Sequence, residues 1–203
     1  MDDVKEIKQG LSAGVVKKIG AFTKDELSQK SLQILTRLFG FANFMEARVV
    51  FCYLNKPGEV DTNKPGEVDT RSIITHCFSC NKVAVVPYDD TNRKDLRLLK
   101  LNDPTADFIT GPKGETVADP NRCRVVPIDS VEIAIIPGLV FDEKGARIGL
   151  GTGYYDKLIP KLPATTRKVS LAFEDQIIAQ VPKGSIDRHV DIIITESRVI
   201  YKI

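Results

Sequence analysis

One segment of the chain combines residues that bind anions with a backbone that can approach a ligand closely. It begins with an arginine, has glycine at every second position and ends in two tyrosines and an aspartate: Arg147-Ile148-Gly149-Leu150-Gly151-Thr152-Gly153-Tyr154-Tyr155-Asp156. Glycine lets backbone N–H groups come close to a bound group, and the planar guanidinium of arginine suits phosphate oxygens. A helix starting near Tyr154 would add the positive end of its dipole. The segment is therefore either a phosphate-binding cradle or a tight loop.

The spacing of this segment excludes the two commonest nucleotide motifs. It contains neither the G-x-G-x-x-G of dinucleotide-binding folds nor the Gly-Lys-Ser/Thr ending of the P-loop. Asp156 has two interpretations, as a first-turn acid favoured by the helix dipole or as a Mg²⁺ ligand close to the phosphates. Tyr154 and Tyr155 are either core residues or ligand contacts. The residues alone leave these alternatives open.

The four cysteines are a second place where chemistry could occur. Cys77 and Cys80 form one C-x-x-C pair, and no second pair follows at zinc-ribbon spacing. A zinc site would require Cys52 or Cys123, with or without His76, to converge on this pair. A redox role would require an activated thiolate. We favour reduced thiols in a cytosolic protein, with Cys52 buried in a strand.

Two helices are predicted at the N-terminus. Thr23 and Glu26 have the spacing of a capping box, which predicts a second helix that ends near Gly40. Before it, apolar residues recur every three or four positions and predict an amphipathic helix that ends at Gly20: Val4, Ile7, Leu11, Val15 and Ile19.

Beyond residue 48 the pattern changes to short apolar runs rich in β-branched residues. These runs predict buried strands at 49–54, 82–86, 132–136, 168–173 and 190–195. Two of them end in Pro87 and Pro137, which cannot donate a ladder hydrogen bond. Helices are predicted between strands at 69–78 and 154–162, and residues 100–129 as a mostly irregular connection. The alternation predicts an α/β fold with a mainly parallel sheet covered on both faces and ligands at the carboxyl ends of its strands.

Composition is that of an ordinary globular protein. The 203 residues are 42% hydrophobic and 28% charged, with a formal net charge of +2, so we expect neither nucleic-acid nor membrane partners. The longest apolar runs are too short to span a bilayer, and the acidic start lacks the features of an export signal. We expect a cytoplasmic monomer with a single domain over 1–203, made of N-terminal helices over 1–40 and an α/β body over 48–203.

The segment from Arg147 to Asp156 resembles the R-[LI]-G-x-G-x-G-Y-Y-D signature of the 5-formyltetrahydrofolate cyclo-ligase (5,10-methenyltetrahydrofolate synthetase) family. The residues at 137–142 also fit, and Glu-Val-Asp-Thr before a helix, 82–87 and 186–191 follow the family's order. The resemblance extends over about residues 8–195. It implies a three-layer α/β sandwich of the kind shared by ribose-phosphate isomerases and CoA transferases.

The resemblance implies an ATP-dependent ligase. The family uses MgATP to phosphorylate the formyl oxygen of 5-formyltetrahydrofolate, which turns a resonance-deactivated amide into an iminium phosphate. N10 then attacks, phosphate departs and the 5,10-methenyl ring closes, with ADP as the other product. The enzyme mainly positions the reactants and stabilises charge. The implied partners are ATP and 5-formyltetrahydrofolate, with or without a polyglutamate tail, and the implied cofactor is Mg²⁺.

The resemblance also implies roles for individual residues. Arg147, Tyr154 and Asp156 would be catalytic, and Asp156 and Asp187 would hold Mg²⁺; on its own, Asp187 would be an ordinary turn former. ATP would contact Lys8, Gln9, Gly10, Leu11, Ser12, Arg147, Ile148, Gly149, Leu150, Gly151, Thr152, Gly153, Tyr154 and Tyr155. The folate would contact Leu54, Glu59, Glu67, Leu150, Gly151, Thr152, Gly153 and Tyr154.

Two features depart from the family pattern. The N-terminal K-x-x-L-R motif ends here in Ser12, so the helix face that carries Lys8 lacks one guanidinium. We expect this to weaken anion binding unless another cation compensates, and Arg93 and Arg122 are the candidates. The sequence Asn-Lys-Pro-Gly-Glu-Val-Asp-Thr also occurs twice in tandem, over 55–62 and 63–70. Loops tolerate such an insertion, because doubling a loop costs only about 0.6 kcal/mol. The second copy abuts a predicted helix, which favours Glu67 as the folate contact.

Two alternative functions remain. Ser12 and the tandem repeat would suit a non-catalytic folate- or nucleotide-binding protein on the same scaffold. A sugar-phosphate isomerase shares this kind of fold, and a fold alone does not decide function. Such an isomerase would not explain the glycine-tyrosine-aspartate segment.

Overall fold

The N-terminal helices have the bounds that the sequence predicts. Helix α1 covers Asp2–Ile19 and α2 covers Lys24–Phe39. Thr23 and Glu26 form the predicted capping box, and Gly40 is the C-cap of α2. The computed structural model describes residues 2–54, 68, 70–90, 95–111, 114–149, 153–182, 184 and 187–202.

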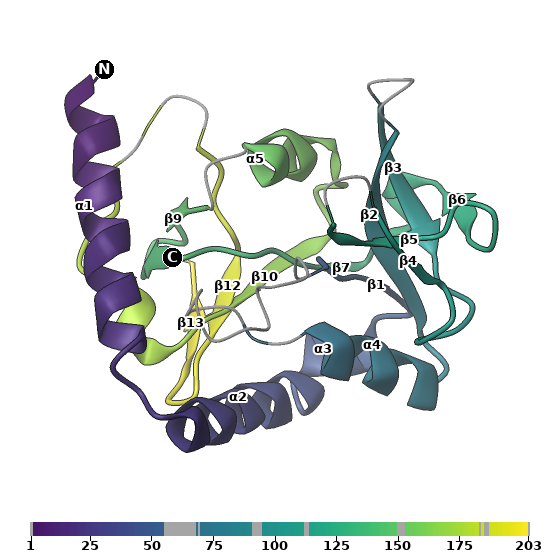
Figure 1. The fold of residues 1–203 in the computed structure, drawn as a ribbon, viewed down its shortest axis with the longest axis horizontal. Helices are drawn as coiled ribbons and strands as arrows, with labels where there is room; N and C mark the ends of the chain where they lie inside the picture. Colours follow the sequence, from purple (N-terminus) through teal and green to yellow (C-terminus); the bar gives the residue numbers. More distant parts are fainter. Residues whose placement is uncertain are drawn as a thin grey trace.

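An eight-stranded sheet occupies the centre of the described molecule (Figure 1), in the order β13-β12-β10-β7-β1-β2-β3-β6. The strands from β12 to β2 run parallel to one another, whereas β13, β3 and β6 lie at the two edges and each pairs antiparallel with the strand before it in the chain or sheet. The predicted mainly parallel sheet is therefore confirmed. The bounds are β1 (Val49–Phe51), β2 (Val83–Asp90), β3 (Asp95–Lys100), β6 (Arg124–Val126), β7 (Ile133–Ile135), β10 (Arg167–Leu171), β12 (Ile192–Ile194) and β13 (Val199–Tyr201).

Helices cover both faces of this sheet, which gives the three expected layers. Helices α2, α3 (Ala42–Glu46) and α4 (Thr70–Ser79) lie on one face, and α5 (Tyr154–Leu158) lies on the other (Figure 1). Alternate strand residues supply two cores: Val50 and Ile133 belong to one, Phe51 and Ala134 to the other. Successive side chains of a strand point to opposite faces, so a sheet buried on both faces requires continuous apolar runs. No helix among the described residues is long and apolar enough to cross a membrane.

Several element boundaries differ from the sequence prediction. Strand β2 continues through Pro87 because Pro87 pairs only with Leu98 of β3 and lies beyond the last β1 pair, Phe51 with Val85; the missing N–H therefore costs no bond to β1. Strand β1 ends at Phe51, so the buried Cys52 lies just after it. Helix α5 gives way to a 3-10 turn, η2 (Ile159–Lys161), because Pro160 has no N–H to continue the α-helix.

The connection over residues 100–129 is richer in strands than predicted. Besides β6 it contains the hairpin of β4 (Phe108–Thr110) and β5 (Thr116–Ala118), and the 3-10 turn η1 (Ile128–Ser130). Strands of three residues are too short to show a two-residue hydrophobic period, so the sequence gives little sign of them.

A second, three-stranded sheet carries the start of the signature segment. Its order is β11-β8-β9, with β8 over Val140–Asp142, β9 over Arg147–Ile148 and β11 over Ile177–Ile178. The buried carboxylate of Asp142 accepts the N–H groups of Lys144, Ala146 and Val181, which fixes the β8–β9 turn. Helix α1 packs against β8 and the 3-10 turn η3 (Glu174–Gln176). The N-terminal helix therefore lies beside the signature segment.

Candidate functional site

Arg147 is the buried centre of the candidate site. Its side chain is 1% exposed, and Nη2 donates to Oδ1 of Asp156 at 2.9 Å while Nη1 donates to the carbonyl of Pro137 at 3.3 Å. Its Nε has no hydrogen-bond partner in the described part of the chain. Burial lowers the pKa of the Arg147 guanidinium, and the charges of Asp156, Tyr155 and Asp187 oppose this effect. A desolvated guanidinium with an unused donor can bind an anion.

At two positions of the signature segment, a side chain would either clash with a neighbour or strain the backbone. A Cβ on residue 149 would lie 2.8 Å from Nη1 of Arg147, so Gly149 makes room for the guanidinium. Gly153 has φ +65° and precedes α5. The predicted contacts Leu150, Gly151 and Thr152 lie outside the described residues. Since α5 has only five residues, its dipole is weaker than the sequence suggested, and side chains supply most of the charge.

One ion pair and one backbone hydrogen bond join distant parts of the chain at this site. Nζ of Lys8, on α1, binds Oδ2 of Asp187, which also accepts the N–H of Gly184 at 2.6 Å. One residue later, the N–H of Arg188 donates to Oδ1 of Asp156 at 3.2 Å, the oxygen that also accepts Arg147. The structure therefore brings Lys8, Asp187, Asp156 and Arg147 into one charged cluster.

The two carboxylates of this cluster fit a magnesium ion. Hydrogen bonds from described residues engage only Oδ1 of Asp156 and Oδ2 of Asp187, so each carboxylate has a second oxygen that no described residue engages. Mg²⁺ is commonly held by one or two carboxylates together with substrate phosphates and waters. Within the described ranges, no group of three or more His, Cys, Asp or Glu residues could hold a metal. Phosphates and waters would therefore complete the coordination.

The two tyrosines belong to both the core and the site. The rings of Tyr154 and Tyr155 meet edge to face, with their centroids 5.0 Å apart. Both rings pack against the core beneath α5. The guanidinium carbon of Arg147 lies over the Tyr155 ring, 6.0 Å from its centroid. Tyr155 therefore helps to fix the direction of the arginine.

The other predicted contacts are less closely gathered. Gln9, Gly10, Leu11 and Ser12 follow Lys8 on α1, and Leu54 is half-buried against the core just after β1. Helix packing does not require a glycine at residue 10, because a Cβ there would have no neighbour within 4 Å. Glu59, Glu67 and Arg93 lie outside the described residues.

Arg122, one of the two candidates to compensate for the missing guanidinium of α1, is engaged elsewhere. Arg122 lies between β5 and β6, on the side of the molecule opposite α1 (Figure 1). Its Nε donates to the buried carboxylate of Asp107 at 3.1 Å. The sequence could not show this, because the β4–β5 hairpin that presents Asp107 was not predicted.

The cysteines do not converge on a metal-binding group in the described residues. Cys52 and Cys77 are buried next to each other, and the hydrogen bond between them raises the pKa of Cys52 and lowers that of Cys77. Cys80 is exposed, with Sγ 3.4 Å from Nε2 of His76. Burial is the main cause that raises the pKa of Cys123 to about 12. None of these thiols approaches the arginine cluster through a contact seen in the structure.

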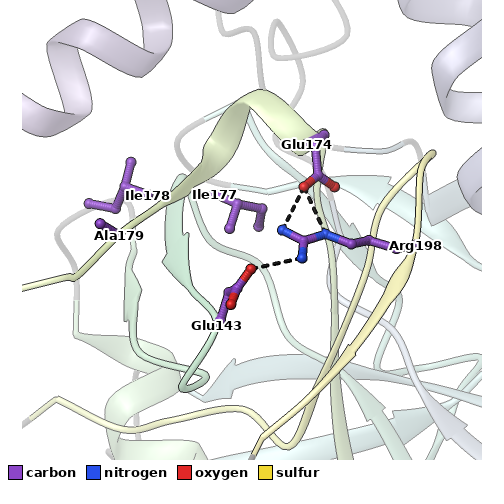
Figure 2. Close-up of a pocket in the computed structure, with 6 residues that line it drawn as sticks. All are labelled: Glu143, Glu174, Ile177, Ile178, Ala179 and Arg198. Carbon is purple, nitrogen blue, oxygen red and sulfur yellow. Dashed lines mark hydrogen bonds and ion pairs between the residues drawn. The ribbon is translucent and has the colours of Figure 1, made fainter.

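A cavity of about 330 Å³ lies beside the small sheet, and none of the predicted site residues lines it (Figure 2). Arg198 crosses the cavity with Nε 2.9 Å and Nη2 2.8 Å from Oε1 of Glu174, and with Nη1 2.8 Å from Oε1 of Glu143. All three nitrogens of this guanidinium are engaged. The lining residues are Glu143, Glu174, Ile177, Ile178, Ala179 and Arg198.

Three backbone contacts of the arginine cluster were missed by sequence reasoning: the carbonyl of Pro137 and the N–H groups of Gly184 and Arg188. Backbone groups leave no signal in residue type. For Pro137 the available clue was its place at the carboxyl end of a parallel strand, where α/β proteins bind ligands.

The fold and this cluster together define an α/β protein in which a buried guanidinium, a lysine and two carboxylates gather beside the signature segment. The model of the 5-formyltetrahydrofolate cyclo-ligase family matches residues 4–196, and the chain belongs to this family. The resemblance inferred from the signature is thereby confirmed.

Similar proteins support the same assignment. The Escherichia coli K12 5-formyltetrahydrofolate cyclo-ligase is 25% identical over 186 residues, covering 88% of this chain and 94% of that protein. A probable 5-formyltetrahydrofolate cyclo-ligase of Schizosaccharomyces pombe is 26% identical, with coverages of 97% and 98%. The NMR structure of Aquifex aeolicus 5,10-methenyltetrahydrofolate synthetase superimposes with a TM-score of 0.80 at 24% identity, covering 97% of this chain and 93% of that one. This likeness confirms the predicted fold.

Proposed function

We propose that the protein converts 5-formyltetrahydrofolate to 5,10-methenyltetrahydrofolate with MgATP, releasing ADP and phosphate. The observation that carries this proposal is the buried Arg147 with its unused Nε. It lies where α1, the signature segment and the loop around Asp187 meet. We also expect the protein to act as a monomer in the cytoplasm.

In this proposal the charged cluster binds the polyphosphate. Lys8 and Arg147 neutralise phosphate oxygens, and Asp156 and Asp187 hold Mg²⁺. The bound metal would neutralise further phosphate charge. Residues 9–12 on α1 and 148–155 in the signature segment complete the ATP contacts. Each carboxylate is paired with a cation in the structure. MgATP binding would therefore separate these pairs, because the carboxylates would bind the metal and the cations would bind phosphate.

The reaction requires the γ-phosphoryl group and the formyl oxygen to meet in a fixed geometry. Arg147 is suited to stabilise the transferred group, because its guanidinium is desolvated and its direction is fixed by Asp156 and Tyr155. Tyr154, packed against Tyr155, would border both substrates. The formyl oxygen becomes a phosphate ester, N10 attacks the activated carbon, and phosphate leaves as the ring closes. An iminium phosphate is the intermediate that we propose.

The folate side of the site would include Leu54 and one glutamate of the tandem repeat. The carbonyl of Val68, which is fully buried, accepts the hydroxyl of Tyr53 at 2.9 Å. Tyr53 precedes Leu54, and Val68 follows Glu67 in the second copy of the repeat, so Val68 is tied to the core through the residue next to Leu54. This contact supports Glu67 rather than Glu59 as the folate-binding acid.

We predict that Glu67→Gln raises the KM for 5-formyltetrahydrofolate about tenfold or more, because a charge-assisted hydrogen bond is lost. Glu59→Gln is the matched control and should change the KM less than twofold. Initial rates at saturating MgATP measure both values. The reverse order would sink the assignment. Deleting residues 55–62 should preserve folding, since it leaves one complete copy of the repeat.

Formation of the methenyl product tests the proposed function directly. The protein is mixed with MgATP and 5-formyltetrahydrofolate, and the absorbance of 5,10-methenyltetrahydrofolate is followed. Absorbance that rises only with MgATP supports the ligase. Tight binding of the folate without turnover would support the alternative, a non-catalytic folate-binding protein on the same scaffold. Ser12, which stands where the family motif has arginine, favours this alternative.

A further inference from the structure

We propose that Arg188 is a phosphate-binding residue of this site, and that it supplies the guanidinium that α1 lacks at Ser12. The inference rests on the proposed function, because it concerns the same MgATP site. Its ligand is the polyphosphate of the nucleotide rather than the folate.

The backbone places Arg188 between the two carboxylates of the cluster. Its N–H donates to Oδ1 of Asp156 at 3.2 Å. Its neighbour Asp187 binds Lys8 of α1 through Oδ2. The backbone N–H of Arg188 contacts Asp156, and the preceding residue, Asp187, contacts Lys8. These two contacts fix the position of the Arg188 Cα. An extended arginine side chain starting from this point can reach an anion held between Lys8 and Arg147.

Arg188 is also the cation of this cluster that is most available to a ligand. Lys8 is bound to Asp187, and Arg147 is bound to Asp156 with its side chain almost fully buried. The Arg188 residue is exposed, and its Nη1 donates to a neutral acceptor, the carbonyl of Asp187, at 3.2 Å. No described residue forms an ion pair with it. Its guanidinium can turn to a phosphate without breaking a charge pair.

The charge balance of the two ion pairs favours such a residue. The two ion pairs, Lys8 with Asp187 and Arg147 with Asp156, sum to no net charge. MgATP remains anionic after the metal is counted, so a neutral cluster would attract it weakly. Arg188 adds the surplus positive charge. Its fork of N–H donors also matches two phosphate oxygens at once, which a lysine cannot do.

The test compares nucleotide affinities of four proteins by isothermal titration calorimetry: wild type, Arg188→Gln, Arg188→Lys and Arg124→Gln. Arg124 is exposed on β6, at the far edge of the sheet, so its replacement makes the same change in net charge away from the site. The Kd of MgATP should rise about ten- to a hundredfold in Arg188→Gln and less in Arg188→Lys. In Arg124→Gln it should stay within about twofold.

The Kd of 5-formyltetrahydrofolate, measured without nucleotide, shows whether Arg188 binds the polyphosphate or the folate tail. Arg188→Gln should leave this Kd unchanged. Adding Ser12→Arg to Arg188→Gln should recover part of the lost MgATP affinity. An unchanged Kd for MgATP in Arg188→Gln, with wild type still forming the methenyl product, would overturn only this inference. A wild type that binds no MgATP would overturn the proposed function itself.

Discussion

Two arginines of this protein lie among carboxylates, yet they have different consequences. The side chain of Arg198 is 47% exposed, and all three of its nitrogens bind Glu174 or Glu143 beside the cavity of Figure 2. The side chain of Arg147 is 1% exposed; among the described residues it forms an ion pair only with Asp156, and its Nε has no partner. The first cluster is complete without a ligand, whereas the second is not.

This difference indicates that a buried donor without a hydrogen-bond partner marks a binding site better than a cavity does. An exposed ion pair contributes little to stability, commonly about 0–1 kcal/mol, so the Arg198 cluster is best explained as a surface tie between the β8–β9 turn, η3 and the turn before β13. A buried guanidinium with an unpaired donor costs free energy in the ligand-free protein. A bound anion would recover that cost, and for this reason we propose the Arg147 cluster as the functional site.

The largest expected effect comes from Asp156→Asn. This change leaves the buried charge of Arg147 without its carboxylate and removes one proposed metal ligand. We expect a loss of about 2–3 kcal/mol in the free energy of unfolding and a fall in turnover of more than about a hundredfold. Urea unfolding and methenyl formation, measured where the variant is fully folded, check both.

Asp175→Asn is the matched control for this experiment. The Asp175 side chain is 38% exposed and lies 3.8 Å from Lys30, so its replacement should change stability by less than about 1 kcal/mol and leave turnover intact. Equal effects of the two substitutions would contradict the distinction between a buried functional pair and a surface pair.

Lys8→Met should have an intermediate effect. The side chains of Lys8 and Asp187 are 19% and 17% exposed, so losing their pair should cost about 1 kcal/mol of stability. The Kd of MgATP should rise about tenfold, because one phosphate-binding cation is gone. Lys5→Met, on the exposed part of the same helix, should bind MgATP normally. Normal binding by Lys8→Met would remove α1 from the site.

The smallest effect is expected at Arg198. Arg198→Gln should lower stability by less than about 1 kcal/mol at neutral pH and leave methenyl formation unchanged. Burial alone would raise the pKa of Glu174, but hydrogen bonds from Thr195 and Arg198 outweigh it and lower that pKa. Ionised Glu174 therefore stabilises the fold above its unfolded pKa of about 4.3, and this contribution disappears as pH falls through the lower folded value.

Unfolding measured from pH 6 to pH 3 should therefore show a steeper acid loss of stability in wild type than in Arg198→Gln. Parallel curves for the two proteins would show that the Arg198 contact does not hold the Glu174 pKa down. A loss of activity in Arg198→Gln would show instead that the cavity of Figure 2 belongs to the catalytic machinery.

Local patterns predicted those parts of the fold that local physics determines. The capping box at Thr23, the apolar period of α1 and the buried strand runs all appear where expected, because each depends on neighbours within a few residues. Strands β4, β5 and β6 were missed because three residues carry no clear period. Strand β2 passes through Pro87 because only one neighbouring strand pairs with it there, a tertiary fact.

The site was predictable to a different degree in each of its halves. Arg147 and Asp156 are nine residues apart in one unusual segment, and their side chains form an ion pair. Lys8 and Asp187 are separated by 179 residues, so only the family resemblance placed them together. Arg188 has no distinguishing local pattern; its contact with Asp156 depends on how the loop around Asp187 packs against α5.

The Mg²⁺ dependence of ATP affinity tests the central claim most directly. Asp187→Asn removes one proposed metal ligand without touching the Arg147–Asp156 pair, so the variant should remain folded. Calorimetric titrations of ATP with Mg²⁺ and with EDTA give the ratio of the two affinities for each protein. The account predicts a ratio of about ten or more for wild type and a ratio near one for Asp187→Asn. A variant that keeps the wild-type ratio would contradict the assignment of this cluster as the MgATP site.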